Sequence, residues 1–561
     1  MERIKDFIDS LPRGMYFEKK QYEISHTRSF EEVKDQLPKP IVSSDRDFID
    51  CYWCTVRLAY RNVHKPSKES GFVSDFVDAA FNEDIFMWDT AFITMFCNLL
   101  HNFIPGISSL DNFYCKQFED GEIPREMVRQ TGKDFHKWVN VNGKPLYSYF
   151  HYRYGHRKLM ETNDVSYEDM YKPDLGRKVP VNPYLTLDNL NHPIMAWAEY
   201  ISYCQTGDID RLKLVMEPLF QYYKALWLHI RHSNNLYVTD WASMDNSPRN
   251  KYLGCAVDAS CEMVLFANSL MDIMKELSKY QHIDNGIYLE RSEFLRTTSQ
   301  LTKEAINNLL WDEETGFYFD LKENGEKAPV KTIAAYWALI SGVADADQVK
   351  KLVNWLNDKN SFNRLHRVPV LAADEEGYDK EGGYWKGSVW APTNTMVIYG
   401  LLKHGYNALA KDIALNHLEN VVKIFEKTGS IWENYPPDFV SSGNADKKDF
   451  VGWSGIAPIL YLIEFKIGLK ADALNQEVIW TIDDETGSKG CENYWFFGKT
   501  ASFYSDINNE LLTVKILTND KFKLKIKYLD KTYEYFIDGG IDGGIDGDAS
   551  IEISEIHIKK Y

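Results

Sequence analysis

Apolar residues recur at intervals of three or four positions through most of the chain between residues 46 and 470, and strict alternation is scarce there. This spacing places the apolar side chains along one face of an α-helix. One such helix is predicted to follow Asp208, a residue type that caps helix N-termini. Its apolar stripe consists of Leu212, Val215, Leu219, Tyr222, Leu226 and Ile230.

The predicted helices come in pairs. The segment from Pro193 to Cys204 has the same periodicity, and a short turn containing Gly207 separates it from the helix that follows Asp208. Two amphipathic helices joined in this way form an αα-hairpin. Further predicted pairs are 258–280 with 298–311, and 333–343 with 346–357. Because no repeat of fixed period relates these pairs, the pattern favours a closed helical toroid over a solenoid.

The pattern changes to alternation after about residue 470. In residues 521–527, charged residues occupy the odd positions and apolar residues the even ones, as in a strand with one buried face. Residues 512–516 and 551–556 repeat this alternation, which predicts a small antiparallel β domain. The Ile-Asp-Gly-Gly repeats of residues 537–548 fit no calcium-binding spacing and are predicted to form a solvated loop. The predicted parts are therefore an N-terminal extension (1–45), a mainly α toroidal domain (46–470) and a C-terminal β domain (471–561).

The charge balance narrows the choice of partner. The 561 residues include 64 Lys+Arg and 82 Asp+Glu, which gives a formal net charge of −18. A field of this sign repels nucleic acid and anionic membrane surfaces, so we expect neither as a partner. Aromatic residues make up 14% of the chain, and rings with one polar edge suit the faces of sugars as well as protein cores. The expected partner is a neutral small molecule, and the sequence carries no signal for an oligomeric state.

The cysteines and the N-terminus bear on the compartment. The eight cysteines lie mainly in apolar runs, which favours reduced and buried thiols. Cys51 and Cys54 form a Cys-x-x-Cys pair with no second pair or histidines nearby, which indicates a structural role. The N-terminus has no apolar signal region, and no stretch reaches the ~18 apolar residues of a membrane span. We expect a cytoplasmic protein, or a periplasmic or secreted one if a leader has been removed.

Six short segments between predicted helices combine aromatic residues with carboxylates, cations or amides. Loops of this kind carry function because the helices hold them rigid. A flat ring and nearby polar groups can together hold a sugar, by stacking on its face and by hydrogen bonds to its hydroxyls. The segments are 86–92, 121–125, 240–249, 383–390, 431–435 and 450–454.

Two carboxylates in these segments are candidates for acid/base chemistry. Asp245 lies in a loop with Ser and Pro, and Glu433 lies between Trp432 and Asn434. Glycoside hydrolysis needs one protonated carboxyl that gives a proton to the leaving oxygen, and one ionised carboxyl that activates water or attacks the sugar. Poorly hydrated aromatic surroundings raise the pKa of the first, whereas polar surroundings keep the second charged. The alternative interpretation makes Asp245 a turn cap and Glu433 an ordinary surface acid.

Other chemistries have no anchor in the sequence. The chain contains no Gly-x-Ser-x-Gly motif, phosphate-binding glycine loop, dinucleotide fingerprint or His-Glu-x-x-His motif. His192, His229 and His366 are scattered, and we interpret them as core or surface groups rather than metal ligands. A pair of carboxyls needs no cofactor for acid/base chemistry, so we expect no cofactor and no metal.

Several of these segments, taken in order, resemble the signature blocks of glycoside hydrolase family 63. That family includes processing α-glucosidases and mannosylglycerate hydrolases, and it is more distantly similar to the trehalases. The blocks here are Trp88-Asp-Thr, 240–249, Tyr384-Trp-Lys-Gly-Ser-Val-Trp390, Trp432-Glu-Asn-Tyr435 and Gly452-Trp-Ser454.

The resemblance implies an (α/α)6 toroid, the fold of the six-hairpin glycosidases, with a central pocket. It also implies inverting, exo-acting hydrolysis of an α-linked glucoside or mannoside in a small oligosaccharide or glycoside. Asp245 would then be the general acid and Glu433 the general base, with carboxyls ~6.5–9.5 Å apart. The positions that match the family's sugar pocket are Trp88, Asp89, Arg125, Asn191, Trp385, Lys386, Trp390, Asn394 and Trp453.

The chain departs from the family pattern in three places. Lys386 stands where the family usually has Arg, which keeps the charge but not the planar fork. Asn191-His192-Pro193 replaces the usual Gln-Pro-Pro, so the sugar contact expected there is shorter or missing. Segment 128–180 resembles an insertion that could cover the pocket. These departures leave the identity of the sugar open.

Alternative functions exist on the same fold. A polysaccharide lyase also pairs a helical toroid with a C-terminal β domain, but it needs a basic groove, which the net charge of −18 disfavours. A catalytically silent sugar-binding protein would keep the pocket, and the presence of both Asp245 and Glu433 disfavours this reading. Phosphorolysis would keep the acid but usually dispenses with the base, and Glu433 is present.

Overall fold

The protein is described here by a computed structural model. It describes residues 9, 12–19, 21–24, 28–43, 45–100, 103–134, 192–237, 244–251, 255–279, 285–322, 324–443, 447–508, 511–539 and 552–559. The predicted pocket residue Asn191, nearly all of the predicted covering segment 128–180 and most of the predicted loop 537–548 lie outside these ranges.

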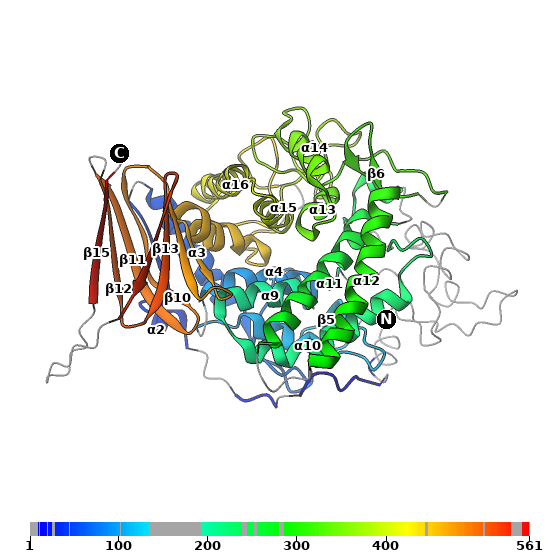
Figure 1. The fold of residues 1–561 in the computed structure, drawn as a ribbon, viewed down its shortest axis with the longest axis horizontal. Helices are drawn as coiled ribbons and strands as arrows, with labels where there is room; N and C mark the ends of the chain where they lie inside the picture. Colours follow the sequence, from blue (N-terminus) through cyan, green and yellow to red (C-terminus); the bar gives the residue numbers. More distant parts are fainter. Residues whose placement is uncertain are drawn as a thin grey trace, which may run out of the picture.

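Six helices form a closed inner ring. Each contacts the next, and the last contacts the first, so the ring has no open edge. In chain order they are α4 (Met87–Cys97), α9 (Met195–Thr206), α11 (Val257–Leu277), α13 (Trp337–Ser341), α15 (Ala391–Lys403) and the π-helix η8 (Ile456–Ile467). Nearly every residue of α4 and η8 is buried, because these helices have neighbours on all sides. The ring confirms the predicted toroid (Figure 1).

Longer amphipathic helices pack around this ring. Among them, α10 contacts α9 and α11, α12 contacts α11, and α16 contacts α15 and η8. Their bounds are α3 (Arg46–Arg61), α10 (Ile209–His229), α12 (Asn285–Leu309), α14 (Ala346–Asn357) and α16 (Asn407–Thr428). Short elements connect them: α2 (Phe30–Val33), α5 (Asp111–Tyr114), β2 (Val63–His64), β3 (Phe76–Val77), β4 (Asp84–Phe86), β5 (Glu126–Val128), β6 (Trp311–Asp312) and β7 (Phe317–Tyr318).

Local signals account for several helix ends. The Asp208 side chain accepts a hydrogen bond from the Arg211 backbone N–H at the start of α10, as predicted. Gly207 ends α9 with a φ of 68°, a left-handed conformation that favours glycine. The helix predicted over 298–311 begins earlier, at Asn285. Its first turns lie outside the ring and leave Leu289 72% exposed, so they carry little of the apolar pattern that predicts a helix.

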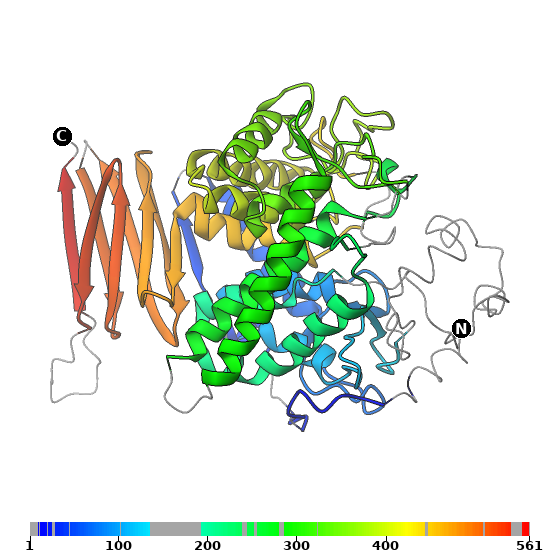
Figure 2. The ribbon, with the colours of Figure 1, turned by 45° about the vertical axis from the view of Figure 1, so that its right-hand side comes forward.

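The C-terminal strands form two sheets beside the helical part (Figures 1 and 2). One has the order β1-β10-β11-β12-β15 and the other the order β14-β13-β9-β8. Their bounds are β1 (Lys39–Val42), β8 (Leu469–Asp472), β9 (Glu477–Ile482), β10 (Gly487–Phe496), β11 (Lys499–Asn508), β12 (Leu511–Thr518), β13 (Phe522–Tyr528), β14 (Lys531–Ile537) and β15 (Glu552–Lys559). The strands predicted by alternation coincide with β12, β13 and β15, and every pair is antiparallel except β9 with β13.

The N-terminal extension takes part in this β structure. Its strand β1 pairs antiparallel with β10, with Lys39 opposite Glu492. The sheets also bond to the inner ring, because the Gln205 amide in α9 donates to the Trp495 carbonyl (2.8 Å) and the Trp480 indole donates to the Ile467 carbonyl (3.0 Å). The strands therefore brace the ends of α9 and η8.

Two further features concern the cysteines and the length of the helices. All eight cysteines are free, and six of them are buried. In the described residues, no helix combines the length and the apolar character that crossing a bilayer requires.

Candidate active site

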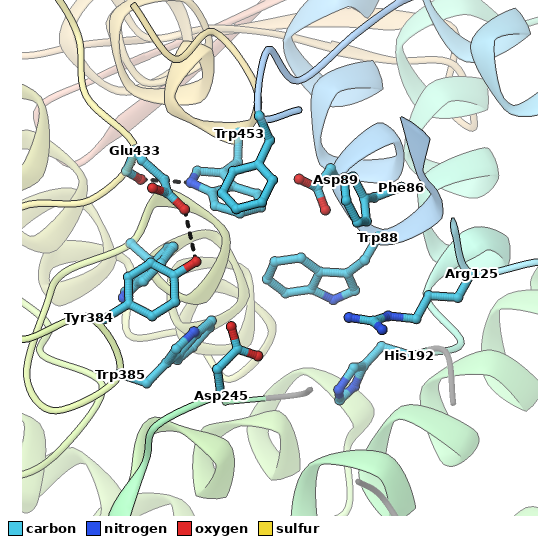
Figure 3. A pocket seen from close by; sticks show the side chains of 12 residues that line it. Phe86, Trp88, Asp89, Arg125, His192, Asp245, Tyr384, Trp385, Glu433 and Trp453 are labelled. Atoms are coloured by element: carbon cyan, nitrogen blue, oxygen red, sulfur yellow. Dashed lines mark hydrogen bonds between the residues drawn. The ribbon is translucent and has the colours of Figure 1, made fainter. Parts of the chain in front are cut away.

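A cavity of about 700 Å³ lies where the inner helices begin. Trp88 and Asp89 belong to the first turn of α4, Trp390 immediately precedes α15, and Trp453 opens the short 3-10 turn that leads into η8. The ring of helices thus brings loops from distant parts of the sequence to one place. The walls are formed by Phe81, Phe86, Trp88, Asp89, Arg125, His192, Asp245, Tyr384, Trp385, Trp390, Glu433 and Trp453 (Figure 3).

Indole rings line much of this cavity. Trp385 stacks on Trp390 with ring centroids 4.5 Å apart and planes 13° apart, and Trp390 lies 5.5 Å from Trp453. Trp88 meets Trp453 edge to face at 5.6 Å. Such rings offer flat apolar faces beside the few polar groups of the cavity, an arrangement suited to sugar rings.

The pairing of two short antiparallel strands places Arg125 beside the first turn of α4. Strands β4 and β5 pair with Phe86 opposite Glu126, and the Met87 N–H donates to the Arg125 carbonyl at 2.9 Å. The pairing therefore holds the Arg125 backbone beside α4, and its side chain lies in the same wall as Trp88 and Asp89 (Figure 3).

The loop that carries Asp245 is tied to the loop beside it through the neighbouring residue, Asn246. The Asn246 side chain accepts a hydrogen bond from the Trp385 N–H (2.9 Å) and donates to the Gly383 carbonyl (3.1 Å). These two bonds link the Asp245 loop to the loop that holds Tyr384 and Trp385.

Arg249 anchors the same loop in the core. Its guanidinium donates to the carboxylates of Asp258 (2.6 and 3.0 Å) and Asp320 (2.7 Å for both bonds), and its side chain is 1% exposed. Asp258 lies in the first turn of α11, and Asp320 also accepts the Val257 N–H. The buried triad therefore connects the Asp245 loop to the start of an inner helix.

Burial raises the pKa of Asp245 from its ordinary 3.8 to about 6, and the positive charge of Arg125 opposes this rise. The pKa of Asp89 is raised well above 3.8, mainly by burial and further by the negative charge of Glu433. The cavity thus favours the protonated forms of both aspartates.

Glu433 is 1% exposed and is held through both its main chain and its side chain. Its N–H donates to the Lys447 carbonyl (3.0 Å), and the Trp453 indole donates to its carbonyl (2.8 Å). The Tyr384 hydroxyl donates to Oε1 at 3.0 Å. Burial and then the charge of Glu433 raise the pKa of Tyr384, so this phenol stays protonated and remains a donor to the carboxylate.

Most of the predicted site residues share this cavity. Asp245 and Glu433 lie on different sides of it, with Tyr384 beside Glu433 and Trp385 beside Asp245 (Figure 3). The predicted sugar contacts that also line it are Trp88, Asp89, Arg125, Trp385, Trp390 and Trp453.

Two predicted sugar contacts require correction. Lys386 is exposed and lines a separate open hollow, because its neighbour Trp385 turns into the cavity. Asn394 is fully buried and bonds to the backbone instead, accepting from the Val368 N–H (3.0 Å) and donating to the Arg367 carbonyl (2.9 Å). Both belong to loops that build the site, but neither side chain lines the cavity.

The cavity also contains residues that the motif analysis left out of the site. Phe86 and Tyr384 stand inside the quoted segments, whereas Phe81 lies just before the first of them. His192, interpreted above as a core or surface group, lies in the wall, and its Nδ1 is 2.5 Å from the Glu262 carboxylate. No sequence signal relates His192 to Glu262, because the fold alone brings them together. Within the described ranges, no group of three or more His, Cys, Asp or Glu side chains could hold a metal ion.

A closed helical ring with two carboxylates facing each other in an aromatic pocket defines the class of toroidal glycosidases. Residues 185–446 match the family model of the mannosylglycerate hydrolase MGH1-like glycoside hydrolase domain. The matched residues lie within the helical part of the chain, and the family model describes a glycoside hydrolase domain, the type of domain that the motifs predict.

Individual proteins are also similar to this chain. An uncharacterised protein of Borreliella burgdorferi is 30% identical over 308 residues, 53% of this chain and 63% of that relative. A cytosolic neutral trehalase of Kluyveromyces lactis is 30% identical over 141 residues, 24% of this chain and 19% of the trehalase. The chain thus spans less than two thirds of both relatives.

A solved structure confirms the fold. The family 63 mannosylglycerate hydrolase of Thermus thermophilus, in complex with glucose, has a TM-score of 0.52 at 17% identity. The match covers 73% of this chain and 99% of that enzyme, so the similar region includes nearly the whole solved structure.

Proposed function

We propose that the protein is an inverting, exo-acting glycoside hydrolase that cleaves an α-linked glucoside or mannoside. The observation that carries this proposal is the pair formed by Asp245 and Glu433 in one aromatic cavity. Burial raises the pKa of Asp245 to about 6, and the hydroxyl of Tyr384 hydrogen-bonds Glu433. One carboxyl is thereby favoured as a proton donor and the other is stabilised as an anion.

In the proposed reaction, the protonated carboxyl of Asp245 gives its proton to the glycosidic oxygen as the bond to the anomeric carbon breaks. The carboxylate of Glu433 takes a proton from a water molecule, whose oxygen bonds to the anomeric carbon from the opposite face. The products are a free sugar of inverted configuration and the alcohol of the leaving group. The indoles of Trp385 and Trp390 offer faces on which the sugar can stack.

Aromatic packing along the axis of the ring supports exo action. Toward the far ends of the inner helices, the ring centroid of Trp88 lies 4.8 Å from that of Phe92, and the Phe92 centroid lies 6.0 Å from that of Trp197. Phe92 is fully buried and Trp197 is 5% exposed, so these rings close the inner end of the cavity. A closed pocket admits the terminal sugar of a chain but not an internal one.

The mannosylglycerate hydrolase and trehalase relatives supply the candidate substrates. The test measures release of free monosaccharide from a panel of α-glucosides and α-mannosides that includes mannosylglycerate and trehalose, with Asp245→Asn as the control. Release by the wild type alone supports hydrolysis and identifies the sugar. Proton NMR then follows the anomer that appears first, and an α-anomer of the sugar released from an α-mannoside or α-glucoside other than trehalose would contradict inversion. From trehalose, inversion should give α- and β-glucose in equal amounts, because the leaving glucose keeps its α configuration. Silence of the folded wild type across the panel would favour a sugar-binding role without catalysis.

A further inference from the structure

A second cavity lies at the other end of the same inner ring. Its walls come from later turns of the helices whose first turns build the active site: Met95 and Asn98 at the end of α4, Tyr399 and Lys403 in α15, and Glu464 in η8. Ten residues separate Trp88 from Asn98, which corresponds to about 15 Å along a helix. The buried rings of Phe92 and Trp197 lie between the two ends. The second cavity is therefore separate from the proposed catalytic pocket.

The charged groups of this cavity balance one another. Glu464 accepts a hydrogen bond from the Tyr399 hydroxyl (3.2 Å), and the ammonium of Lys470 lies 3.6 Å from the same carboxylate oxygen. Across the cavity, the positive charge of Lys403 acts on the carboxylate of Asp272. The Lys403 ammonium also donates a hydrogen bond to the Ile340 carbonyl at 2.8 Å. Two carboxylates and two ammonium groups give no net charge. A neutral ligand with many hydroxyls suits such a wall, because each hydroxyl can both donate and accept.

Two polar groups in the wall have hydrogen-bonding capacity left over. Asn98 is 3% exposed, and its Oδ1 accepts from the Ser202 hydroxyl (3.0 Å), but its Nδ2 has no hydrogen-bond partner among the described residues. The half-buried carboxylate of Asp272 makes no hydrogen bond or ion pair with any residue that the structure describes. A buried amide hydrogen without a partner is unfavourable, so a ligand oxygen at this place would stabilise the complex.

Aromatic rings complete the wall. Trp197, Tyr200 and Tyr399 all line the cavity, and Trp197 meets Tyr399 edge to face at 6.3 Å. The space measures about 980 Å³ including its open mouth. Rings, amides and balanced charges in a half-enclosed space are the features that hold uncharged sugars.

We propose that this cavity, formed by the far ends of the inner helices, is a second binding site for a neutral sugar of monosaccharide size. Asn98 donates to one ligand oxygen, Asp272 accepts from one hydroxyl, and the ring of Tyr200 or Tyr399 covers the apolar face of the sugar. This site does not depend on the proposed hydrolysis, because none of its residues lines the catalytic pocket.

The chain contains its own reporter for this site. Cys204 lines the second cavity, whereas Cys54 lines neither cavity, and these are the two cysteines that are not fully buried. Burial raises the pKa of both thiols, that of Cys204 to about 12, so both react slowly with a small neutral reagent such as methyl methanethiosulfonate. Peptide mass spectrometry can follow the two labelling rates in one sample, with Cys54 as the internal control.

The experiment labels the full chain in the presence of D-glucose or D-mannose over a range of concentrations. At ten times the Kd, one of these sugars should slow labelling of Cys204 about elevenfold by mass action and leave Cys54 unchanged. Asp272→Asn and Asn98→Leu should each move the protection curve to higher sugar concentration. Asp245→Asn should leave the curve in place, which separates this site from the catalytic pocket.

Three results would overturn the proposal. The first is a Cys204 labelling rate that neither sugar changes. The second is equal slowing of Cys54, which indicates a general effect on the protein. The third is full protection in the folded Asp272→Asn protein together with its loss in Asp245→Asn, which places the bound sugar in the catalytic pocket instead.

Discussion

Replacement of Asp245 by Asn tests the assignment of the proton donor directly. Burial shifts the pKa of this carboxyl from 3.8 to about 6. At about 1.36 kcal/mol per unit, this shift favours the protonated form by about 3 kcal/mol. At pH 6 about half of the molecules then carry the proton, compared with about 1% for an ordinary aspartate. The amide of Asn cannot give up a proton, so turnover should fall by about 10²–10⁴-fold.

The pH profile adds a second readout that loss of folding cannot imitate. The protonated carboxyl is the active form, so the kcat/KM of the wild type should fall about tenfold per pH unit above pH 6. Asp245→Asn should lose this limb, because it has no proton to lose. Arg125→Gln should move the limb to higher pH, since the charge of Arg125 lowers the pKa of Asp245. The assay is release of monosaccharide from the substrate identified in the panel, measured between pH 4 and 9.

Two controls make the result specific. A glycosyl fluoride has a leaving group that needs little protonation, so Asp245→Asn should retain far more of its activity on the fluoride than on the natural linkage. Asp374→Asn changes an exposed carboxylate that pairs with Lys331 at 2.7 Å outside the cavity, and it should behave as the wild type. A loss below tenfold in Asp245→Asn, or an unchanged limb above pH 6, would refute the assignment.

Three further predictions concern the base, the buried triad and acid stability. Glu433→Gln should strongly lower the rate of hydrolysis of the natural substrate and of the fluoride alike, because both reactions need activated water. Activity on the fluoride alone would point to a different base. Arg249→Met should lower the free energy of unfolding in urea by about 3–5 kcal/mol, because it leaves two buried carboxylates unpaired. The same change at Arg296, which belongs to an exposed ion pair, should lower the free energy of unfolding by less than about 1 kcal/mol. Equal losses at the two positions would show that the triad adds nothing to stability. Burial lowers the pKa of His366 and that of His417, the latter to about 3. Both histidines therefore bind protons more readily in the unfolded chain, and the free energy of unfolding should fall as the pH drops below about 6.5. Urea unfolding at pH 7, 5 and 4 measures this fall, and an equally steep fall in His417→Gln would exclude His417 as its source.

The sequence predicted the helical part where apolar periodicity and caps agree. Helix α14 has the predicted bounds because Asp345 and Gln348 form a capping box in front of a clean apolar stripe. Strand β1 was not predicted, because four residues are too short to show alternation and its partner strand begins more than 400 positions later. Local patterns report which face of an element is buried, but they do not report which distant element covers it.

The same limit explains the candidate site. The motifs identified the loops that build the cavity, because each loop precedes or begins an inner helix. They did not identify which side chains turn inward, and the exposed Lys386 beside the buried Trp385 shows the difference. The ion pairs from Arg249 to Asp258 and Asp320 also left no local signal, since Asp320 is 71 positions away.

The two side-chain departures from the family pattern, at Lys386 and His192, therefore differ in how much they change the surface of the cavity. Lys386 is outside the cavity wall, so exchange of the family's Arg for Lys at this position does not change the described surface that faces a sugar. His192 is in the wall next to Arg125, and the carboxylate of Glu262 fixes its ring through Nδ1 (Figure 3). Burial raises the pKa of Glu262, and the interaction with His192 opposes this rise. The chain thus places an imidazole beside Arg125, and the preference for substrate should follow this side of the pocket rather than Lys386.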